Sequence, residues 1–303
     1  KKISAEERSN YLKKFHLLVL KNKKNIAKII TRECGKPLRE SLVEVEYGAS
    51  FIEWSANQCL RNCGKIFESS DKTKKMFYIK EPVGVVAAIT PWNFPLAMVT
   101  RKVSAALAAG CCVVLKPSEL TPITALVLGE LSVEAKFPKG IFNIVNGKPK
   151  VIGDILSKNP TVKKITFTGS TKVGKLLMKN SSKTIKNISL ELGGNAPFIV
   201  FSDANIDLAI EGLINAKFRN AGQTCISANR IFLNKKIYEN FLIKLKNRLK
   251  KMRIGSGLKD CDIGPLISKQ ALEKVENHIQ DALNKGAKIE FGGKLHKPNS
   301  LLF

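Results

Sequence analysis

Between residues 83 and 193 the sequence alternates short apolar runs with longer helical segments, and this alternation constrains the fold more than any other feature. The apolar runs are 85–89, 112–115, 142–145, 164–167 and 188–191, and the helical segments between them are 96–109, 122–135, 149–157 and 171–180. Short strands that are bounded by turns and alternate with helices form βαβ units, whose strands are parallel. The sequence therefore predicts an α/β fold with a Rossmann-like, doubly wound parallel sheet.

The flanking segments suggest how the chain divides into domains. Residues 1–63 read as helices and are expected to form one domain with residues 83–193, while residues 64–82 read as a short hairpin ending at Pro82. The pair Gly193-Gly194 marks a hinge, and residues 194–303 are expected to form a second α/β domain. Because the chain begins without Met and stops in what reads as an incipient strand, we expect a fragment truncated at both ends, with its second domain incomplete.

The charge of the chain leaves two interpretations. There are 51 Lys and Arg against 25 Asp and Glu, a net charge of +26, which is typical of nucleic-acid-binding proteins or of a compositional bias on solvated faces. The basic residues are dispersed along the whole chain, which favours the second interpretation and no nucleic-acid partner. No apolar run reaches the roughly 18 residues of a membrane span, so no membrane partner is expected.

The cysteines and histidines limit the chemistry. Seven cysteines without a small-scaffold pattern indicate a reducing compartment, so we expect the cytoplasm, with the mitochondrial matrix left open in case an N-terminal address is missing. The three histidines, at 16, 278 and 296, argue against a His-based triad or a multi-His site, and no metal is expected.

One cysteine stands in a segment suited to chemistry. Cys225 follows Gly222-Gln223-Thr224, where glycine lets the backbone approach a bound molecule closely. Without a CxxC partner it is a candidate nucleophile; the alternative is a buried, inert thiol. Arg219, six residues earlier, is a fixed cation that can hold an anionic substrate.

Polar clusters follow the predicted strands, where ligands bind in doubly wound sheets. They are Trp92-Asn93, Lys116 to Glu119, Gly169-Ser170 and Glu191. The segment Gly169–Gly174 opens a helix whose N–H groups can meet a phosphate; the alternative is that Ser170 is a plain N-cap.

Each remaining cluster also has two interpretations. Lys116 and Glu119 can grip a ribose diol or form a surface ion pair. Asn93 can donate its amide N–H to an oxyanion or serve as a turn residue. Glu191, at an apolar strand end, can be a base whose pKa is raised by desolvation, or a satisfied cap or core carboxylate. Together with Cys225, the clusters supply a nucleophile, a hydrogen-bond donor for an oxyanion, a base and a dinucleotide-binding site. This combination favours covalent oxidation through a thioester.

Five segments resemble the NAD(P)-dependent aldehyde dehydrogenase superfamily: Thr90-Pro-Trp-Asn-Phe-Pro95, Lys116-Pro-Ser-Glu119, Phe167-Thr-Gly-Ser170, Leu190-Glu-Leu-Gly-Gly-Asn-Ala-Pro197 and Phe218 to Cys225. The resemblance implies that Cys225 is the nucleophile, that Glu191 activates the deacylating water, and that Asn93 forms an oxyanion hole with the Cys225 N–H. The cofactor-binding residues it implies are Thr90, Trp92, Lys116, Ser118, Glu119, Gly169, Ser170, Val173 and Leu192.

Within the superfamily the chain resembles the succinate-semialdehyde dehydrogenases, in Met98-Val-Thr-Arg-Lys-Val103, Ala196–Phe201 and Ala216–Cys225. This implies an acidic aldehyde substrate whose carboxylate is clamped by Arg101 and Arg219, and a homo-oligomer, a tetramer or a dimer. The alternatives for the substrate are glutarate semialdehyde or a broader set of aldehydes.

Three departures from the superfamily matter. Many members carry Cys-Val-Cys where this chain has Cys225-Ile226-Ser227, so a disulfide switch at this point is not expected. Glu119 stands where NADP-preferring members carry a small residue, which favours NAD, with NADP left open, because a carboxylate repels a 2′-phosphate. The superfamily's later cofactor and substrate contacts and its oligomerisation strand lie beyond residue 303, so we expect this fragment alone to be inactive.

Overall fold

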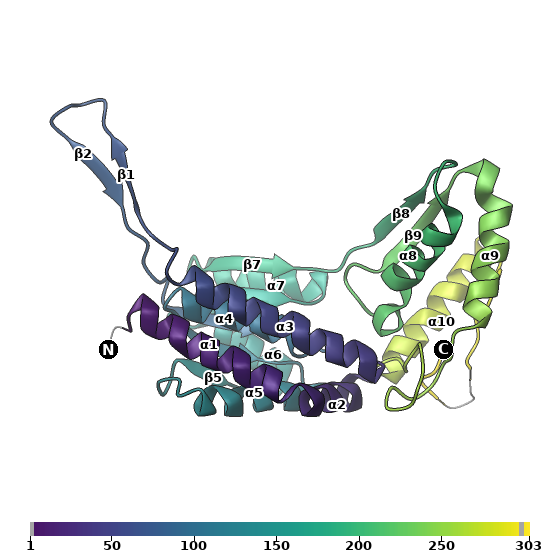
Figure 1. The fold of residues 1–303 in the computed structure, drawn as a ribbon, viewed down its shortest axis with the longest axis horizontal. Coiled ribbons are helices and arrows are strands. Elements are labelled where there is room, and N and C mark those ends of the chain that lie inside the picture. Colours follow the sequence, from purple (N-terminus) through teal and green to yellow (C-terminus); the bar gives the residue numbers. More distant parts are fainter. Residues whose placement is uncertain (1–2, 297–299) are drawn as a thin grey trace. The chain divides into compact units, whose positions relative to one another are not determined.

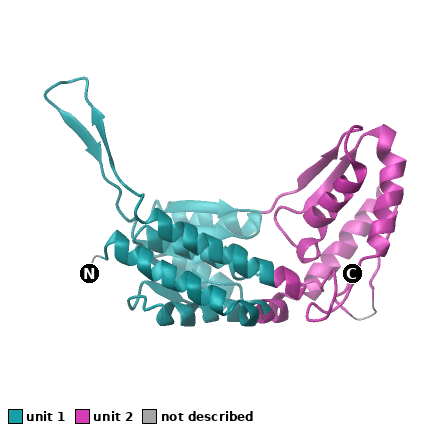
Figure 2. Cartoon of the chain, in the orientation of Figure 1, with its two compact units in different colours: residues 1–27, 42–192 teal, residues 28–41, 193–303 magenta. Residues whose placement is uncertain are grey.

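The computed structural model describes residues 3–296 and 300–303. The chain forms two compact units, residues 1–27 with 42–192 and residues 28–41 with 193–303 (Figure 2). Residues 28–41 join the second unit, although the sequence pattern groups them with the N-terminal helices. The predicted domain limits stay a prediction.

The first unit is built on a five-stranded sheet in the order β5-β4-β3-β6-β7 (Figure 1). Its strands are β3 (Val85–Ile89), β4 (Cys112–Lys116), β5 (Phe142–Ile144), β6 (Val162–Thr168) and β7 (Asn187–Glu191). All neighbouring pairs are parallel. The strand order reverses direction between β3 and β6, so the predicted doubly wound sheet is confirmed, and its switch point lies between these two strands.

Helices connect these strands and form the rest of the unit. They are α1 (Ala5–Lys21), α3 (Leu38–Gln58), α4 (Ala97–Ala108), α5 (Pro122–Glu134), α6 (Pro149–Lys158) and α7 (Thr171–Ser182). Helix α1 packs against α4 and α5, whereas α6 packs against α7. The first four residues of α3 belong to the second unit, as does most of α2 (Lys23–Cys34).

The core explains why the apolar runs form strands. Val86 to Ile89 of β3 are all buried, as is typical of a parallel strand with both faces covered. On one side β3 and β6 pack with α6 and α7 in a cluster of Ala87, Ile89, Leu156, Val162, Ile165, Phe167 and Leu177. Apolar packing against the helices stabilises the sheet, and the polar residues lie at the ends of its strands.

The predicted hairpin is present as β1 (Lys65–Glu68) and β2 (Lys75–Tyr78), an antiparallel pair that stands off the rest of its unit (Figure 1). All eight strand residues are exposed, and Ile66 and Phe77 have 83% and 71% of their surface open. Apolar side chains gathered on an exposed ribbon indicate an interaction surface.

The second unit contains a parallel pair, β8 (Ala196–Val200) and β9 (Ala228–Leu233), joined through α8 (Ile206–Phe218). It also holds the short 3-10 helices η1 (Arg219–Gly222) and η2 (Lys235–Ile237), and the helices α9 (Tyr238–Lys250) and α10 (Lys269–Asn284). Its core consists of Val200, Ile210, Leu213, Ile214, Ala228, Ile237 and Phe241. The second α/β unit that the sequence predicts is therefore present.

Shortening a core side chain tests this packing. Ile165 is fully buried in β6, so Ile165→Ala should lower the free energy of unfolding by about 2–5 kcal/mol through lost burial and a cavity. Ile155→Ala, at an exposed position of α6, is the matched control and should change it by less than about 0.5 kcal/mol. Urea unfolding followed by circular dichroism measures both; equal losses would contradict the assigned core.

Candidate active site

The parallel register of the first unit brings its predicted site residues to one edge of the sheet. Ile89 of β3 pairs with Lys116 of β4 and with Phe167 of β6, and Thr168 pairs with Glu191 of β7. The ladders run past the strand ends, because Thr90 N–H donates to the Lys116 carbonyl and Gly169 N–H to the Glu191 carbonyl, each at 3.1 Å. These hydrogen bonds fix the backbone at the start of the loops that follow β3 and β6.

Two hydroxyls at this edge are available to a polar ligand. Thr90 Oγ1 and Thr168 Oγ1 are buried and have no hydrogen-bond partner within the described part of the chain. A buried polar group normally has a partner, so the two hydroxyls fit a polar ligand at the carboxyl ends of β3 and β6. The sequence assigned no role to Thr168, although its position between a strand and Gly169 is a usable signal.

Lys116 and Glu119 form an ion pair with an Nζ–Oε2 distance of 2.7 Å. Only 5% of the Lys116 side chain is exposed against 48% of that of Glu119, so the pair is anchored on its lysine side. Burial acts to raise the pKa of Glu119, but the hydrogen bond and charge of Lys116 outweigh it, and the pKa is lowered. Glu119 thus presents a carboxylate to solvent at the strand edge, as a ribose-binding group requires.

The N-terminus of α7 is both capped and closely packed. Ser170 Oγ accepts a hydrogen bond from Val173 N–H at 3.3 Å, so the N-cap interpretation of Ser170 is correct. A Cβ on Gly174 would lie 2.7 Å from Leu192 Cδ2, so only glycine lets α7 approach Leu192 this closely. Val173 is 42% exposed beside them. Together with the two unpartnered hydroxyls, these residues fit a dinucleotide cofactor; their contact with it stays a prediction.

Asn93 lies in the loop between β3 and α4, and the helix that follows is held by a residue that the sequence did not reveal. The N-cap of α4, Leu96, has no side-chain cap, but Oε1 of the buried Glu44 accepts hydrogen bonds from Leu96 N–H at 2.9 Å and Ala97 N–H at 3.2 Å. A carboxylate at a helix N-terminus also favours the helix dipole. Glu44 lies 52 residues from Leu96, which is why no local pattern indicates the contact.

Glu191 does not have the predicted environment. Residues alternate between exposed and half-buried along β7, the last strand on its side of the sheet, and Glu191 falls on the exposed side. The expectation of a desolvated carboxylate is therefore wrong, since one side chain in two faces outward on this strand.

The perturbed group beside Glu191 is Lys102 of α4. It is 7% exposed, and its Nζ donates to Thr166 Oγ1 at 3.2 Å. Burial lowers the pKa of Lys102 to about 8, while the charge of Glu191 acts in the opposite direction. A buried lysine that titrates near neutral pH next to a proposed base is a candidate functional residue. The sequence gives no sign of this role, because Lys102 lies in a segment read as an apolar helix.

Arg101, next along α4, is held by aromatic side chains. Its guanidinium lies 4.8 Å from the centre of the Phe51 ring, and Nη2 donates to Tyr47 Oη at 3.4 Å. Stacking on an aromatic face restrains a side chain that is otherwise exposed. Arg101 is therefore both a helix-surface charge, the alternative interpretation, and a restrained cation suited to binding an anion.

Cys225 and Arg219 belong to the second unit, and both are exposed. The exposed Cys225 thiol rules out the interpretation as a buried, inert cysteine, whereas Cys34, Cys59, Cys111 and Cys261 are buried. The backbone before Cys225 is strained, because Asn220 and Ala221 have φ values of 52° and 55°. Asparagine tolerates this left-handed region, whereas alanine adopts it at a cost of about 1–2 kcal/mol. The joining of Cys225 and Arg219 with the strand-end residues into one active site stays a prediction.

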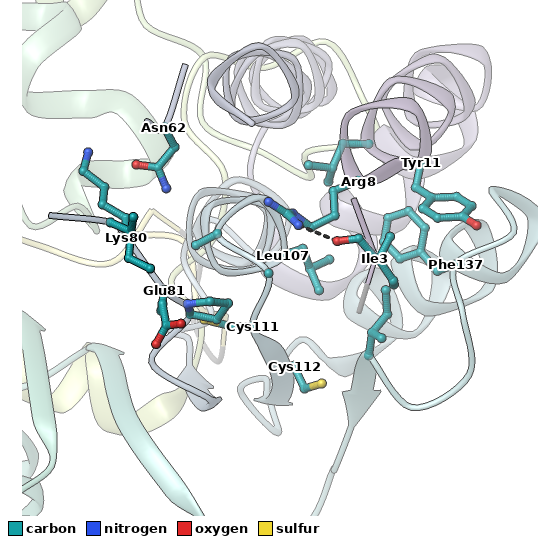
Figure 3. Close-up of a pocket in the computed structure, with 16 residues that line it drawn as sticks. Ile3, Arg8, Tyr11, Asn62, Lys80, Glu81, Leu107, Cys111, Cys112 and Phe137 are labelled. Atoms are coloured by element: carbon teal, nitrogen blue, oxygen red, sulfur yellow. Dashed lines mark hydrogen bonds between the residues drawn. The ribbon is translucent and has the colours of Figure 1, made fainter. Parts of the chain in front are cut away.

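A cavity of about 550 Å³ lies elsewhere in the first unit (Figure 3). Arg8, Tyr11, Glu81, Cys112 and Phe137 are among the residues that line it. Cys112 begins β4, so the cavity lies at the opposite end of that strand from Lys116. Arg8 donates to the Ile3 and Ala108 carbonyls, at 2.7 and 2.9 Å. No predicted site residue is among its lining residues, so its size does not make it the active site.

The strand-end residues of the first unit lie where doubly wound sheets bind their ligands. Residues 1–302 match the family described as the aldehyde dehydrogenase family, and the chain belongs to that family. No described helix has the length and apolar content that a bilayer crossing needs.

Several individual proteins of known name are similar to this chain. The chain is 52% identical over 296 residues to mitochondrial succinate-semialdehyde dehydrogenase of Oryza sativa subsp. japonica, covering 97% of this chain and 56% of that protein. It is 48% identical to glutarate-semialdehyde dehydrogenase of Pseudomonas aeruginosa, covering 99% and 62%. A crystal structure titled as an E. coli NADP dependent enzyme superposes with a TM-score of 0.98 at 49% identity, covering 99% and 63%. The chain thus spans less than two thirds of the length of each.

The lowered pKa of Lys102 gives a testable pH dependence. Its folded pKa of about 8 is below the ordinary 10.5, so between these values the unfolded chain binds more protons and stability rises with pH. Lys102→Met lacks the titrating group and should not show this rise. Between about pH 8 and 10.5, wild type should therefore gain unfolding free energy relative to the variant. Urea unfolding at several pH values measures it; parallel pH curves would contradict the buried titration.

Proposed function

We propose that this chain carries the nucleophile and the cofactor-binding residues of an aldehyde dehydrogenase that oxidises succinate semialdehyde to succinate. The observation that carries the proposal is the exposed Cys225 thiol, on a strained loop that also bears Arg219, in a chain of the aldehyde dehydrogenase family. Cys225, Asn93 and Glu191 are the proposed catalytic residues.

The proposed reaction has two stages. The Cys225 thiolate attacks the aldehyde carbon, and the carbonyl oxygen becomes an oxyanion that the Asn93 side-chain N–H and the Cys225 N–H stabilise. Bound NAD(P) supplies the acceptor for the hydride that leaves this carbon. Glu191 then takes a proton from water, which attacks the resulting thioester; the carbon–sulfur bond breaks, and the acid and the thiolate are released. The exposure of Glu191 gives it access to water, and Lys102 supplies a nearby positive charge.

The cofactor is proposed to lie at the strand ends of the first unit. Lys116 and Glu119 would hold the adenosine ribose, with Thr90 and Ser118 nearby; Ser170 and the Gly169 turn would meet the pyrophosphate; and Trp92, Val173 and Leu192 would line the cleft. The solvent-facing carboxylate of Glu119 supports NAD, since it would repel a 2′-phosphate. NADP is the alternative cofactor, because the similar E. coli structure is of an NADP-dependent enzyme.

An acidic aldehyde is the proposed substrate. Two exposed arginines support it, Arg219 beside the nucleophile and Arg101 restrained by Phe51 and Tyr47, because a guanidinium pairs with a carboxylate through two hydrogen bonds. Glutarate semialdehyde, which is one methylene longer, is the alternative that the Pseudomonas relative suggests. A homo-oligomer is also proposed, and the exposed apolar side chains of the β1–β2 hairpin support it.

The nucleophile is tested in the protein at its full natural length. Cys225→Ala should abolish aldehyde-dependent NADH formation, because no other step can form the thioester. Cys63→Ala, which removes another exposed thiol, is the matched control and should leave the rate unchanged. Turnover that persists in Cys225→Ala would refute the covalent mechanism.

The carboxylate clamp is tested through substrate preference. Arg219→Ala should raise KM for succinate semialdehyde about 10- to 100-fold, the effect of losing a charge-assisted hydrogen bond, with a much smaller change for butanal. Arg61→Ala, which removes an exposed arginine of the first unit, is the control. Steady-state kinetics on both aldehydes give the comparison, and an equal increase for the two would refute the clamp.

A further inference from the structure

The loop that leads to Cys225 has a backbone conformation that one of its residues, Ala221, does not favour. Asn220, Ala221 and Gly222 are consecutive residues with φ values of 52°, 55° and 75°. Glycine adopts this left-handed region readily, but alanine does not, since its Cβ crowds the following carbonyl. Contacts from outside the loop must therefore hold it.

Asn220 is where these contacts converge. Its backbone N–H donates to Oε2 of Glu40 at 2.8 Å. Its carbonyl accepts from the backbone N–H of Gln223 at 3.0 Å and from Gln223 Nε2 at 3.1 Å. Gln223 Oε1 in turn accepts from Ile267 N–H at 3.0 Å. Both backbone polar groups of the first left-handed residue are thus fixed, one of them by a residue 180 positions away.

The environment of Glu40 indicates that this contact is specific. Glu40 lies in the first turn of α3, within the part of that helix that belongs to the second unit. Burial raises the pKa of Glu40, while the Asn220 N–H and the charges of Lys36, Arg39 and Arg219 act to lower it. A carboxylate that is partly removed from water keeps its place through such partners. One of these cations, Arg219, is the proposed substrate-binding arginine.

We propose that Glu40 is a positioning residue: by binding the Asn220 N–H it holds the left-handed loop so that Arg219 and Cys225, on either side of it, keep fixed positions. This inference rests on the proposed function, because it assigns Glu40 a role in that reaction. Glu40 acts through the backbone of the loop and not on the reacting atoms. A purely structural role would stabilise the unit without affecting the reactivity of Cys225.

The experiment measures acylation of Cys225 in the full-length protein. The probe is p-nitrophenyl acetate, an activated ester that acylates a thiolate and releases p-nitrophenolate, so that neither the aldehyde nor the cofactor is needed. Four variants are compared with wild type: Glu40→Ala, Glu40→Gln, Cys225→Ala, and Glu53→Ala as an exposed-carboxylate control on the same helix. Thermal unfolding and NAD affinity, which report on folding and on the cofactor-binding unit, are measured alongside.

Glu40→Ala should slow Cys225-dependent acylation by at least about tenfold, since a charge-assisted hydrogen bond to the loop is lost. Glu40→Gln keeps an oxygen that accepts from Asn220 N–H and should stay within about threefold of wild type. Glu53→Ala should match wild type in acylation rate, NAD affinity and unfolding temperature. Glu40→Ala should keep the NAD affinity of wild type, while its unfolding temperature falls because the Asn220 N–H loses its acceptor. If Glu40→Ala fails to fold, Glu40→Asp, whose shorter side chain draws the carboxylate back from the Asn220 N–H, should show the same tenfold loss.

The outcomes separate the two proposals. Acylation by Glu40→Ala as fast as by Glu53→Ala, or a loss in Glu40→Gln as large as in Glu40→Ala, would overturn the positioning role and leave the proposed function intact. A loss of acylation confined to temperatures at which Glu40→Ala is already partly unfolded would also overturn it. Acylation that persists in Cys225→Ala would instead overturn the nucleophile, and this inference with it.

Discussion

The arrangement of the first unit depends on the parallel hydrogen-bond ladders that place β3 between β4 and β6. Because parallel strands end at the same edge, these ladders bring together residues from four separate stretches of sequence, among them Thr90, Lys116, Thr168 and Glu191. The central strand β3 forms because its apolar side chains are buried on both faces. The hydroxyls of Thr90 and Thr168 at this edge are buried and have no partner among the described residues, which fits the binding of a polar ligand there.

Much of this could be predicted from sequence, for a physical reason. Strand, turn and helix signals are local, and the order of the strands in a doubly wound sheet follows from few topologies, so the fold and the strand-end residues were accessible. The environment of Glu191 was not, because its exposure depends on which face of a terminal strand it occupies. Lys102 and Glu44 were missed because their burial and partners come from packing between elements distant in sequence. Glu40 escaped notice for the same reason, since its partner lies 180 residues away.

Helix α3 shows how a scaffold element can serve chemistry without taking part in it. Two of its glutamates, Glu40 and Glu44, are one turn apart, and each binds backbone N–H groups of a segment next to a proposed catalytic residue. Glu44 caps the helix after the Asn93 loop, and Glu40 holds the loop before Cys225. Backbone amides are present whatever the side chain, so such contacts fix the path of the chain and leave the neighbouring side chains free to differ.

The buried Ser227 affects how the loop would respond to oxidants. It stands two residues after the exposed Cys225 and donates its hydroxyl to the Lys217 carbonyl at 3.4 Å, while the other cysteines of the second unit, Cys34 and Cys261, are buried. A thiol oxidised to a sulfenic acid returns to the reduced state through attack by a second thiol. Since the loop offers none, a small thiol from solution would have to supply it, and the product would be a mixed disulfide on Cys225. Recovery from peroxide would then depend on the thiol pool around the protein rather than on the loop itself.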